Sequence, residues 1–309
     1  MTNLLKSSAI NPVFRGLYNF LSVLDRVFRV KLLGRLRVSG TVHLKFQSHE
    51  FEMFSAWDDH IVDLLYFKGR EYSELAELGI FSALARGSKV ILDVGANTGL
   101  YSIVSAKANP DAKIIGFEPY PVNYARLQKN LRINGLLQNV SAVNLALGDS
   151  NDTIRFAVPA GGQICDVSSA DVDFTKQHYQ TWLSYKEIEV EQVTLDAFCQ
   201  EQNFETVDLI KIDVENYELS VLKGASEALA KYSPVILIEI FVDEERRRFF
   251  EEVLKPNGYY CYLITKEGLV RTETLIENPD CGNVVLSKKK SEREYLSFSD
   301  MESLVNELR

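Results

Sequence analysis

A glycine-containing turn, preceded by an acidic residue, follows an apolar run in the first third of the chain. The segment Ile91–Gly99 reads ILDVGANTG and places Asp93 two residues before Gly95. Between a strand and a helix, Gly95 would let the backbone pass close to a ligand, and Gly99 would let the helix pack tightly on the strand. The spacing predicts a nucleotide-binding turn.

The same turn favours a cationic ligand over a dinucleotide. Dinucleotide loops follow the pattern G-x-G-x-x-G and direct a helix N-terminus at a pyrophosphate. Here Asn97 stands where the middle glycine would be, and the carboxylate of Asp93 would repel a pyrophosphate. That carboxylate suits a ligand with an ammonium group, such as S-adenosylmethionine. An NAD(P)-dependent or nucleotide-sugar oxidoreductase is the alternative enzyme.

Acidic residues also end three later apolar runs. Glu118 lies 23 positions after Gly95, where an acid can accept hydrogen bonds from both ribose hydroxyls. Asp213 and Glu215 follow the fourth run, and Glu239 ends the fifth. Ligands of open α/β sheets bind at the carboxyl ends of strands, so these carboxylates should share one crevice. For Glu215, capping of the next helix is the competing structural explanation.

From Lys89 onward, apolar runs alternate with helical periods, which predicts an α/β fold with a parallel sheet covered by helices. Near-continuous apolar runs predict strands that are buried on both faces. The expected strands are 90–94, 113–117, 140–145, 207–212 and 234–240, and the expected helices are 100–108, 121–134, 218–230 and 243–254. Residues 259–264 and 283–286 should pair as an antiparallel edge.

Several motifs, taken in order, resemble those of a known family. They are VILDVGANTGLYS at 90–102, GFEP at 116–119 with Asn123, ALG at 146–148, TLD at 194–196, IKIDVE at 210–215 with Glu218, and VLKG at 221–224. From about Tyr66 to Leu286 the chain resembles the FkbM-type methyltransferases, a branch of the class I S-adenosylmethionine-dependent enzymes. The resemblance implies a Rossmann-like α/β fold with a seven-stranded, mostly parallel sheet whose last strand is antiparallel.

The resemblance also implies S-adenosylmethionine as the cofactor and assigns residues to its parts. Asp93, Gly95 and Asn97 would line the methionine portion. Glu118 would hold the ribose, with Pro119 beside the adenine. The other positions assigned to the cofactor site are Gly99, Tyr101, Asn123, Ala146 bordering the adenine, and Asp213 near the amino group or the acceptor.

The implied reaction is O-methylation of a hydroxyl on a sugar, a glycan or a secondary metabolite. A hydroxyl acceptor needs a proton acceptor, and we expect Asp213, Glu215 or Glu239 to be this base. Glu239 lies within an apolar run, so it should have a partner or a raised pKa. His60 could reach over the crevice as the base, although a surface histidine is the simpler interpretation.

Other acceptor contacts and metal ligands are less well specified. Tyr72 and Glu74 are the weaker candidates for contact with the acceptor. The sequence assigns no metal ligands, although a magnesium-assisted route would need carboxylates such as those at the strand ends.

The chain departs from the family pattern at Asn216, where the family usually has glycine. Asparagine tolerates a left-handed backbone better than most residues, so the turn should form. Its Cβ should narrow the approach to the crevice. The departure keeps another alternative open, a catalytically silent binding module in a glycan or polyketide pathway.

The patterns divide the chain into four parts. Residues 1–38 would be a basic, amphipathic helical extension, and 39–75 a substrate or lid region. Residues 76–290 would be the cofactor-binding domain with an insertion at 149–194, and 291–309 a C-terminal helix.

Charge is unevenly distributed along the chain. The net charge is −9, but residues 1–45 sum to +7 and the rest to −16, so a nucleic-acid partner is disfavoured. Apolar side chains recur at helical spacing within 13–33: Phe14, Leu17, Leu21, Leu24 and Phe28. This helix could pack on its own domain, join a second subunit in a homo-oligomer, or lie on an anionic membrane surface through residues 11–38.

The four cysteines form no C-x-x-C pair or zinc-like spacing, and the N-terminus lacks the features of a signal peptide. We therefore expect reduced thiols and a cytoplasmic protein, with peripheral membrane contact as an option.

Overall fold

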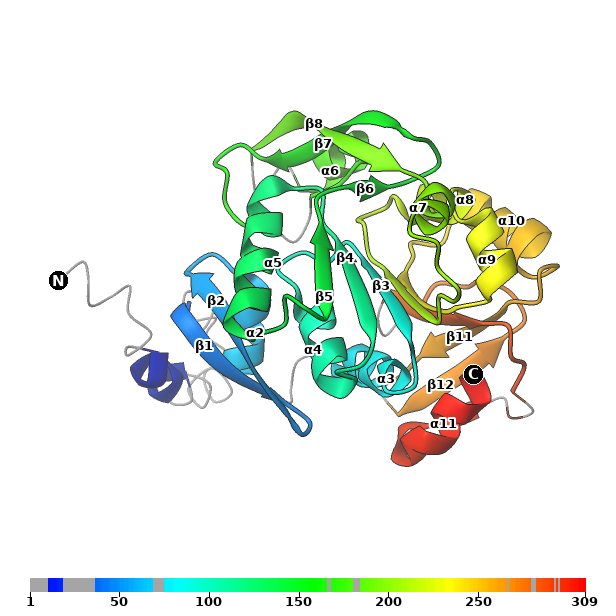
Figure 1. Cartoon of the computed structure of the whole chain (residues 1–309), viewed down its shortest axis with the longest axis horizontal. Coiled ribbons are helices and arrows are strands. Elements are labelled where there is room, and N and C mark those ends of the chain that lie inside the picture. The colour runs from blue at the N-terminus through cyan, green and yellow to red at the C-terminus, as the bar shows by residue number, and fades with distance from the viewer. Residues whose placement is uncertain are drawn as a thin grey trace, which may run out of the picture.

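The computed structural model describes residues 11–18, 37–68, 75–165, 168–179, 184–265, 267–278, 282–291, 293 and 295–309. Its centre is a nine-stranded sheet in the order β14-β12-β11-β13-β10-β9-β3-β4-β5 (Figure 1). The strands are β3 (Val90–Val94), β4 (Lys113–Phe117), β5 (Val140–Val143), β9 (Leu209–Ile212), β10 (Val235–Glu239), β11 (Tyr260–Ile264), β12 (Gly268–Thr272), β13 (Asn283–Ser287) and β14 (Tyr295–Ser297).

Seven of these strands have the expected arrangement. The five strands β5, β4, β3, β9 and β10 run parallel to one another. Strand β13 is antiparallel to both β10 and β11. The predicted α/β fold is confirmed, including its antiparallel last strand. Strands β12 and β14 extend the edge beyond the seven and were not expected. β12 follows a tight turn in which the Thr265 N–H donates to the Gly268 carbonyl.

Alternate side chains of the strands pack into two cores, one on each face of the sheet. On β3, Ile91 belongs to one core and Leu92 to the other. The first core includes residues of α3 (Leu75–Ala85), α4 (Leu100–Ala108), α5 (Pro121–Ile133) and α11 (Met301–Leu308). The second includes residues of α7 (Leu195–Glu201), α8 (Glu218–Lys223), α9 (Ser226–Tyr232) and η4 (Phe250–Leu254). The helices therefore cover a sheet whose strands are buried on both faces.

Three expected helices differ in extent from the observed ones. The 218–230 helix is divided into α8 and α9 at Gly224, where a Cβ would lie 1.9 Å from the Gly148 carbonyl oxygen. The 243–254 helix is α10 (Glu244–Phe249) followed by the π-helical turn η4. Within 291–309, β14 and the short 3-10 turn η5 (Phe298–Asp300) precede α11.

The segment that interrupts the α/β alternation forms a second sheet. Strands β6 (Ala146–Leu147), β8 (Tyr185–Val193) and β7 (Asp152–Pro159) lie in that order, and α6 (Val172–Tyr179) occurs between β7 and β8. Figure 1 shows this small sheet across one end of the central sheet. It is therefore placed to cover the strand ends.

The N-terminal part packs on α5, through residues in the C-terminal half of that helix. β1 (Ser39–Phe46) and β2 (His49–Ala56) form an antiparallel hairpin, followed by α2 (His60–Phe67). The backbone N–H groups of Glu52 and Phe54 donate to the side chains of Asn134 and Asn130 on α5, at 2.9 and 2.8 Å. These contacts fix the hairpin to the main body.

A helix at residues 11–18 packs on this hairpin and on α2. Phe14 contacts Trp57 with ring centroids 6.4 Å apart, and Tyr18 stacks on Phe67 at 5.0 Å. The later positions of the apolar period, Leu21, Leu24 and Phe28, lie outside the described residues. Among the described helices, none has the length and apolarity needed to cross a bilayer.

Candidate active site

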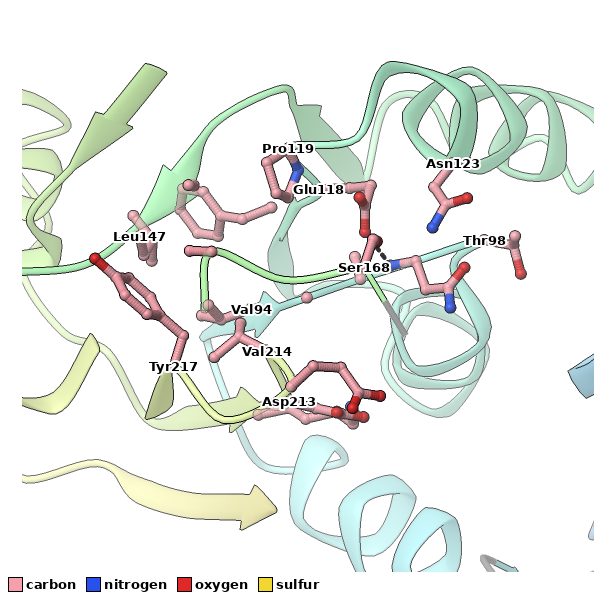
Figure 2. A pocket seen from close by; sticks show the side chains of 18 of the residues that line it. Val94, Thr98, Glu118, Pro119, Asn123, Leu147, Ser168, Asp213, Val214 and Tyr217 are labelled. Carbon is pink, nitrogen blue, oxygen red and sulfur yellow. Dashed lines mark hydrogen bonds and ion pairs between the residues drawn. The ribbon is translucent and has the colours of Figure 1, made fainter. Parts of the chain in front are cut away.

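A cavity lies at the carboxyl ends of β3, β4 and β9, beneath the insertion (Figure 2). Eight of the predicted cofactor-site residues line it: Gly95, Asn97, Tyr101, Glu118, Pro119, Asn123, Ala146 and Asp213. Asp93 and Gly99 do not belong to its wall. The topology therefore brings most of the predicted site together from separate parts of the sequence.

The two glycines of the turn are required by contacts within the protein. Gly95 has φ +81°, and a Cβ there would lie 1.8 Å from the Asp213 carbonyl oxygen. Gly99 has φ +100°, and its Cβ would lie 2.5 Å from a methyl carbon of Leu127 on α5. Gly95 thus lets the β3 and β9 turns meet, and Gly99 lets α5 pack against the start of α4.

Glu118 is a buried carboxyl group held at the cavity wall. Its Oε2 accepts from the backbone N–H of Asn97 at 2.9 Å, and its Oε1 accepts from that of Tyr120 at 2.8 Å. Burial raises the pKa of Glu118 to about 8, although both hydrogen bonds oppose this shift. Each oxygen keeps a lone pair for a further donor such as a ribose hydroxyl.

The wall next to Glu118 is largely apolar. In Figure 2, Pro119, Leu147 and Tyr217 surround one part of the cavity, while Asp213 lies in another. Ala146 and Phe156, which comes from β7 of the insertion, complete this part. Such a surface suits a flat heteroaromatic base.

Asn123 lines the cavity but is engaged with the insertion. Its Nδ2 donates to the Cys165 carbonyl at 2.7 Å, and its Oδ1 accepts from the Cys165 N–H at 3.2 Å. The Tyr120 hydroxyl also donates to the Gln163 carbonyl at 3.2 Å. These contacts fix the 163–165 segment over the cavity.

Asp93 is buried behind the turn and acts within the protein interior. Its Oδ2 accepts from the Ser102 hydroxyl at 2.6 Å. Burial raises the pKa of Asp93, and the nearby positive charge of Lys211 opposes the shift. The ammonium of Lys211 also lies 4.4 Å from the ring centroid of Tyr101. Asp93 therefore acts on the site indirectly, because its negative charge favours the charged form of Lys211, which pairs with Asp213.

The three carboxylates proposed as bases form one cluster. Asp213, Glu215 and Glu239 each place an oxygen within 4.8 Å of the others, a separation that could also suit a cation. Asp213 and Glu215 line the cavity, and Glu239 does not. The buried Lys211 ammonium lies 2.6 Å from Asp213 Oδ2. The cluster thus includes an internal positive charge.

One proton is held within the Asp213–Glu239 pair. The negative charge of Asp213 and burial raise the pKa of Glu239 to about 10. Burial alone would raise the pKa of Asp213, but the Lys211 charge and a hydrogen bond from Glu239 lower it overall. At neutral pH Glu239 is therefore protonated and Asp213 is ionised.

Asn216 has the left-handed backbone that glycine would favour, with φ +72°. Its side chain is not part of the cavity wall, and its Nδ2 donates to Asp171 Oδ2 at 2.8 Å. The expectation that its Cβ would narrow the crevice is therefore wrong, because the side chain is directed to the insertion.

Of the three residues predicted for acceptor contact, the structure describes His60, which does not line the cavity. His60 is exposed at the start of α2, and its Nδ1 lies 3.2 Å from the Arg37 guanidinium, whereas the next residue, Ile61, lines the cavity. Tyr72 and Glu74 lie outside the described residues.

Sequence reasoning missed several wall residues: Ile61, Phe156, Cys165, Ser168 and Tyr217. Only Tyr217, which follows the IKIDVE motif at 210–215 by two residues, had a usable signal. The others depend on how the hairpin region and the insertion fold over the sheet.

Residues 93–259, more than half of the chain, match the family model described as the methyltransferase FkbM domain. The chain belongs to the FkbM methyltransferase family. It is therefore a methyltransferase that uses S-adenosylmethionine, and the oxidoreductase and silent-module alternatives are set aside.

Relatives of the FkbM family match the chain in part. Methyltransferase sdnD of Sordaria araneosa is 29% identical over 188 residues, which cover 55% of this chain and 73% of that protein. The 2-O-methyltransferase NoeI of Sinorhizobium fredii is 34% identical over 160 residues, which cover 49% of this chain and 63% of NoeI, less than two thirds of its length. A crystal structure of a methyltransferase FkbM from Methylobacillus flagellatus aligns with TM-score 0.40 and 18% identity, over 74% of this chain and 55% of that one.

The chemistry of the cavity fits the cofactor of the FkbM family. S-adenosylmethionine has an adenine, two ribose hydroxyls, and positive charges on sulfur and nitrogen. The apolar wall, the Glu118 carboxyl, and the Asp213 and Glu215 carboxylates match these groups in kind.

Proposed function

We propose that this enzyme methylates a hydroxyl oxygen of a sugar, a glycan or a secondary metabolite. The observation that carries the proposal is the ionised Asp213 carboxylate, which lines the cavity with 35% of its side-chain surface exposed. A hydroxyl acceptor must lose a proton, and a fixed carboxylate beside the methyl donor can accept it. The name of one relative, the 2-O-methyltransferase NoeI, gives further support.

In this proposal the predicted cofactor residues act through the contacts available to them. When bound, S-adenosylmethionine supplies a methyl group on a positively charged sulfur. Glu118 accepts the ribose hydroxyls, and Pro119 and Ala146 pack beside the adenine. Gly95 and Asn97 lie along the methionine part. Holding the acceptor oxygen in line with the methyl group supplies most of the acceleration.

Asp213 is the proposed base, and its neighbours keep it ionised. Lys211 balances its charge, while protonated Glu239 donates a hydrogen bond to it. Glu215 also lines the cavity and is the alternative base. Because Glu239 is protonated at neutral pH, it cannot accept the acceptor's proton.

The test compares Asp213→Asn with Glu215→Gln. We expect Asp213→Asn to lower kcat by about 10²-fold or more. The affinity for S-adenosylhomocysteine is measured separately by calorimetry, so that a loss of cofactor binding is distinguished from the loss of the base. Thermal unfolding checks that Lys211, deprived of its partner, has not disrupted the fold. Loss of turnover only in Glu215→Gln would move the base to Glu215, and full turnover in both would refute a carboxylate base here.

The same cluster has no need of a cation to balance its charge. Lys211 is positive and Glu239 carries a proton, so two of the three acidic residues are compensated. We expect turnover to persist after dialysis against EDTA. Loss of activity that magnesium restores would instead assign the three carboxylates to a metal.

We further propose a cytoplasmic enzyme whose basic segment 11–38 contacts anionic membrane surfaces. The described part of this segment leaves Val13 and Leu17 exposed by 66% and 42%, although Phe14 packs inward. Association of two copies through this segment is the alternative. Sedimentation with anionic and with zwitterionic vesicles tests the first idea, and sedimentation equilibrium tests the second. Absence of binding to both vesicle types would exclude the membrane contact.

A further inference from the structure

The turn after β9 contains two consecutive residues with left-handed backbone. Glu215 has φ +54° and Asn216 has φ +72°. Such values are uncommon for residues other than glycine, and asparagine tolerates them better than glutamate. Glu215 lines the cavity, so the conformation of this pair decides where a carboxylate of the reaction site lies. Contacts elsewhere in the protein must hold the pair in place.

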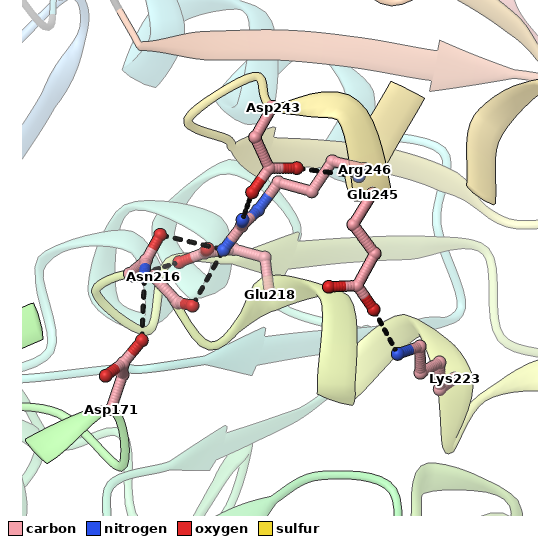
Figure 3. Close-up of polar contacts among 7 residues, drawn as sticks. All are labelled: Asp171, Asn216, Glu218, Lys223, Asp243, Glu245 and Arg246. Atoms are coloured by element: carbon pink, nitrogen blue, oxygen red, sulfur yellow. Dashed lines mark hydrogen bonds and ion pairs between the residues drawn. The ribbon is translucent and has the colours of Figure 1, made fainter. Parts of the chain in front are cut away.

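Asn216 is the centre of a polar network that supplies these contacts (Figure 3). Its Nδ2 donates to Asp171 Oδ2 at 2.8 Å. The Arg246 Nη2 donates to both the side-chain and backbone oxygens of Asn216, at 2.7 and 2.9 Å. The backbone N–H of Asn216 donates to Glu218 Oε1 at 3.1 Å. Arg246 and Glu218 are buried, so their hydrogen bonds with Asn216 are partly shielded from water.

Two partners of Asn216, Asp171 and Arg246, make further contacts within the elements next to the β9 turn. Asp171 Oδ1 accepts from the Phe174 N–H at 2.9 Å near the start of α6. Asp243 caps α10 through the Arg246 N–H at 2.8 Å and pairs with the Arg246 guanidinium. One amide thus connects the β9 turn, the insertion and α10.

Two aromatic rings lie at the outer ends of this network. Phe174 is three residues after Asp171, and Phe241 is two residues before Asp243. Their ring centroids are 5.6 Å apart at an interplanar angle of 45°. Phe241 is 43% exposed, and it follows Glu239, a member of the carboxylate cluster, by two residues. Phe174 is half-buried, so the pair presents chiefly the Phe241 ring, a surface that suits the apolar face of a sugar or of another ring system.

We infer that Asn216 is a positioning residue for the acceptor. It holds the Glu215 turn and the α6 segment together, so that the Phe174–Phe241 pair contacts the apolar face of the acceptor while its hydroxyl reaches the carboxylates. This inference rests on the proposed methyl transfer to a hydroxyl. The inference assigns a role in acceptor binding to Asn216, which stands where the family usually has glycine.

The experiment uses the full chain with p-nitrophenyl glycosides as acceptors. Asn216→Gly keeps the left-handed backbone accessible but removes the amide. We expect the KM for the best glycoside to rise about tenfold or more, with a smaller change in kcat. The affinity for S-adenosylhomocysteine should change little, because Asn216 does not line the cavity.

A pair of exchanged side chains separates this role from a general loss of stability. Asn216→Asp faces Asp171 with a second carboxylate and should raise KM further. Adding Asp171→Asn exchanges donor and acceptor, so the double variant should recover most of the acceptor KM. Glu245→Gln removes only the 2.9 Å exposed pair with Lys223 on the same helices and should behave as wild type.

Hydrogen exchange of residues 168–179 gives a readout that needs no activity. Exchange should quicken in Asn216→Gly and return towards wild type in the double variant. Unchanged exchange, an unchanged KM in an active enzyme, or no recovery in the double variant would each overturn the inference. If the wild type methylates no hydroxyl acceptor, the proposed function fails. The hydrogen-exchange rates of residues 168–179 then test separately whether Asn216 holds the insertion in place.

Discussion

Glu239 shows how a single buried proton links the reaction site to stability. Its pKa rises from an ordinary 4.5 to about 10 in the folded protein, chiefly because of the negative charge of Asp213. Below pH 4.5 both the folded and the unfolded chain carry this proton. Above it the unfolded chain loses the proton and the folded chain keeps it, so this group's contribution to stability falls as pH rises towards 10.

Glu239→Gln should therefore stabilise the protein at neutral and alkaline pH. Glutamine keeps a donor for Asp213 but never ionises in the unfolded chain. We expect a gain in the free energy of unfolding on the order of 1–3 kcal/mol at pH 8, discounted for partial exposure, and almost none at pH 4. Denaturant unfolding at both pH values measures it, and an equal effect at both would contradict the shared proton.

Glu118 predicts a pH dependence of cofactor affinity. Its pKa is about 8 in the free protein, whereas hydroxyl donors favour the ionised form. Below that value, binding must remove a proton, so affinity should fall with decreasing pH. We expect S-adenosylhomocysteine to bind about tenfold more weakly at pH 6 than at pH 8. Calorimetry should show this slope in the wild type and not in Glu118→Gln, and a slope common to both would exclude Glu118 as its source.

At the residue scale, the sequence indicated the motif positions but not their contacts. Because Glu239 is an acid within an apolar run, we predicted a partner or a raised pKa for it, and Glu239 has both: a hydrogen bond with Asp213 and a pKa raised to about 10. The roles of Asn123 and Asn216 could not be predicted, because both bond to the insertion, whose path over the cavity has no local signal.

At the scale of elements, the turn between β3 and α4 is where backbone geometry matters most. Gly95 and Gly135 both have positive φ, but only Gly95 would direct a Cβ into backbone, at the Asp213 carbonyl. Gly135→Ala should cost about 1–2 kcal/mol from backbone strain alone.

Gly95→Ala should cost at least about 2 kcal/mol more than the Gly135 variant, because the β3 and β9 turns must separate. It should also weaken S-adenosylhomocysteine binding, whereas Gly135→Ala should not. Chemical denaturation with calorimetry compares the two, and equal losses of stability would show that the close approach carries no cost.

Elements with strong local patterns were predicted to the residue, as β3, β4 and α4 show. Errors occur where tertiary contacts override the local pattern. The helical period is interrupted at Gly224, where the Gly148 backbone lies too close for a side chain. β12 and β14 pair only with each other and with β11 at the sheet edge, so their short runs gave little signal.

At the scale of the whole molecule, the last helix closes the first core. Leu304 and Leu308 of α11 are buried in the core that contains α3, and the Arg309 guanidinium donates to the Leu84 carbonyl and to Ser88 Oγ. These contacts join residues more than 200 positions apart, which no local pattern could predict.

Leu308→Ala should consequently lower the free energy of unfolding by about 2–4 kcal/mol, since it leaves a cavity in that core. Glu302→Ala, at an exposed position of the same helix, should change it by less than about 0.5 kcal/mol. Urea unfolding distinguishes them, and similar small effects would mean that α11 is only loosely attached.

The rate at which a cysteine of the cavity wall is alkylated should report whether a ligand fills the cavity. Cys199 and Cys261 lie in the second core, where burial raises both thiol pKa values to about 12 and keeps them unreactive. Among the described cysteines, Cys165 alone lines the cavity, on a segment fastened by Asn123. A small neutral alkylating reagent should therefore label Cys165 slowly in the empty enzyme and more slowly as S-adenosylhomocysteine fills the cavity. Peptide mass spectrometry could then follow cofactor binding during acceptor screening, before any methylated product is known.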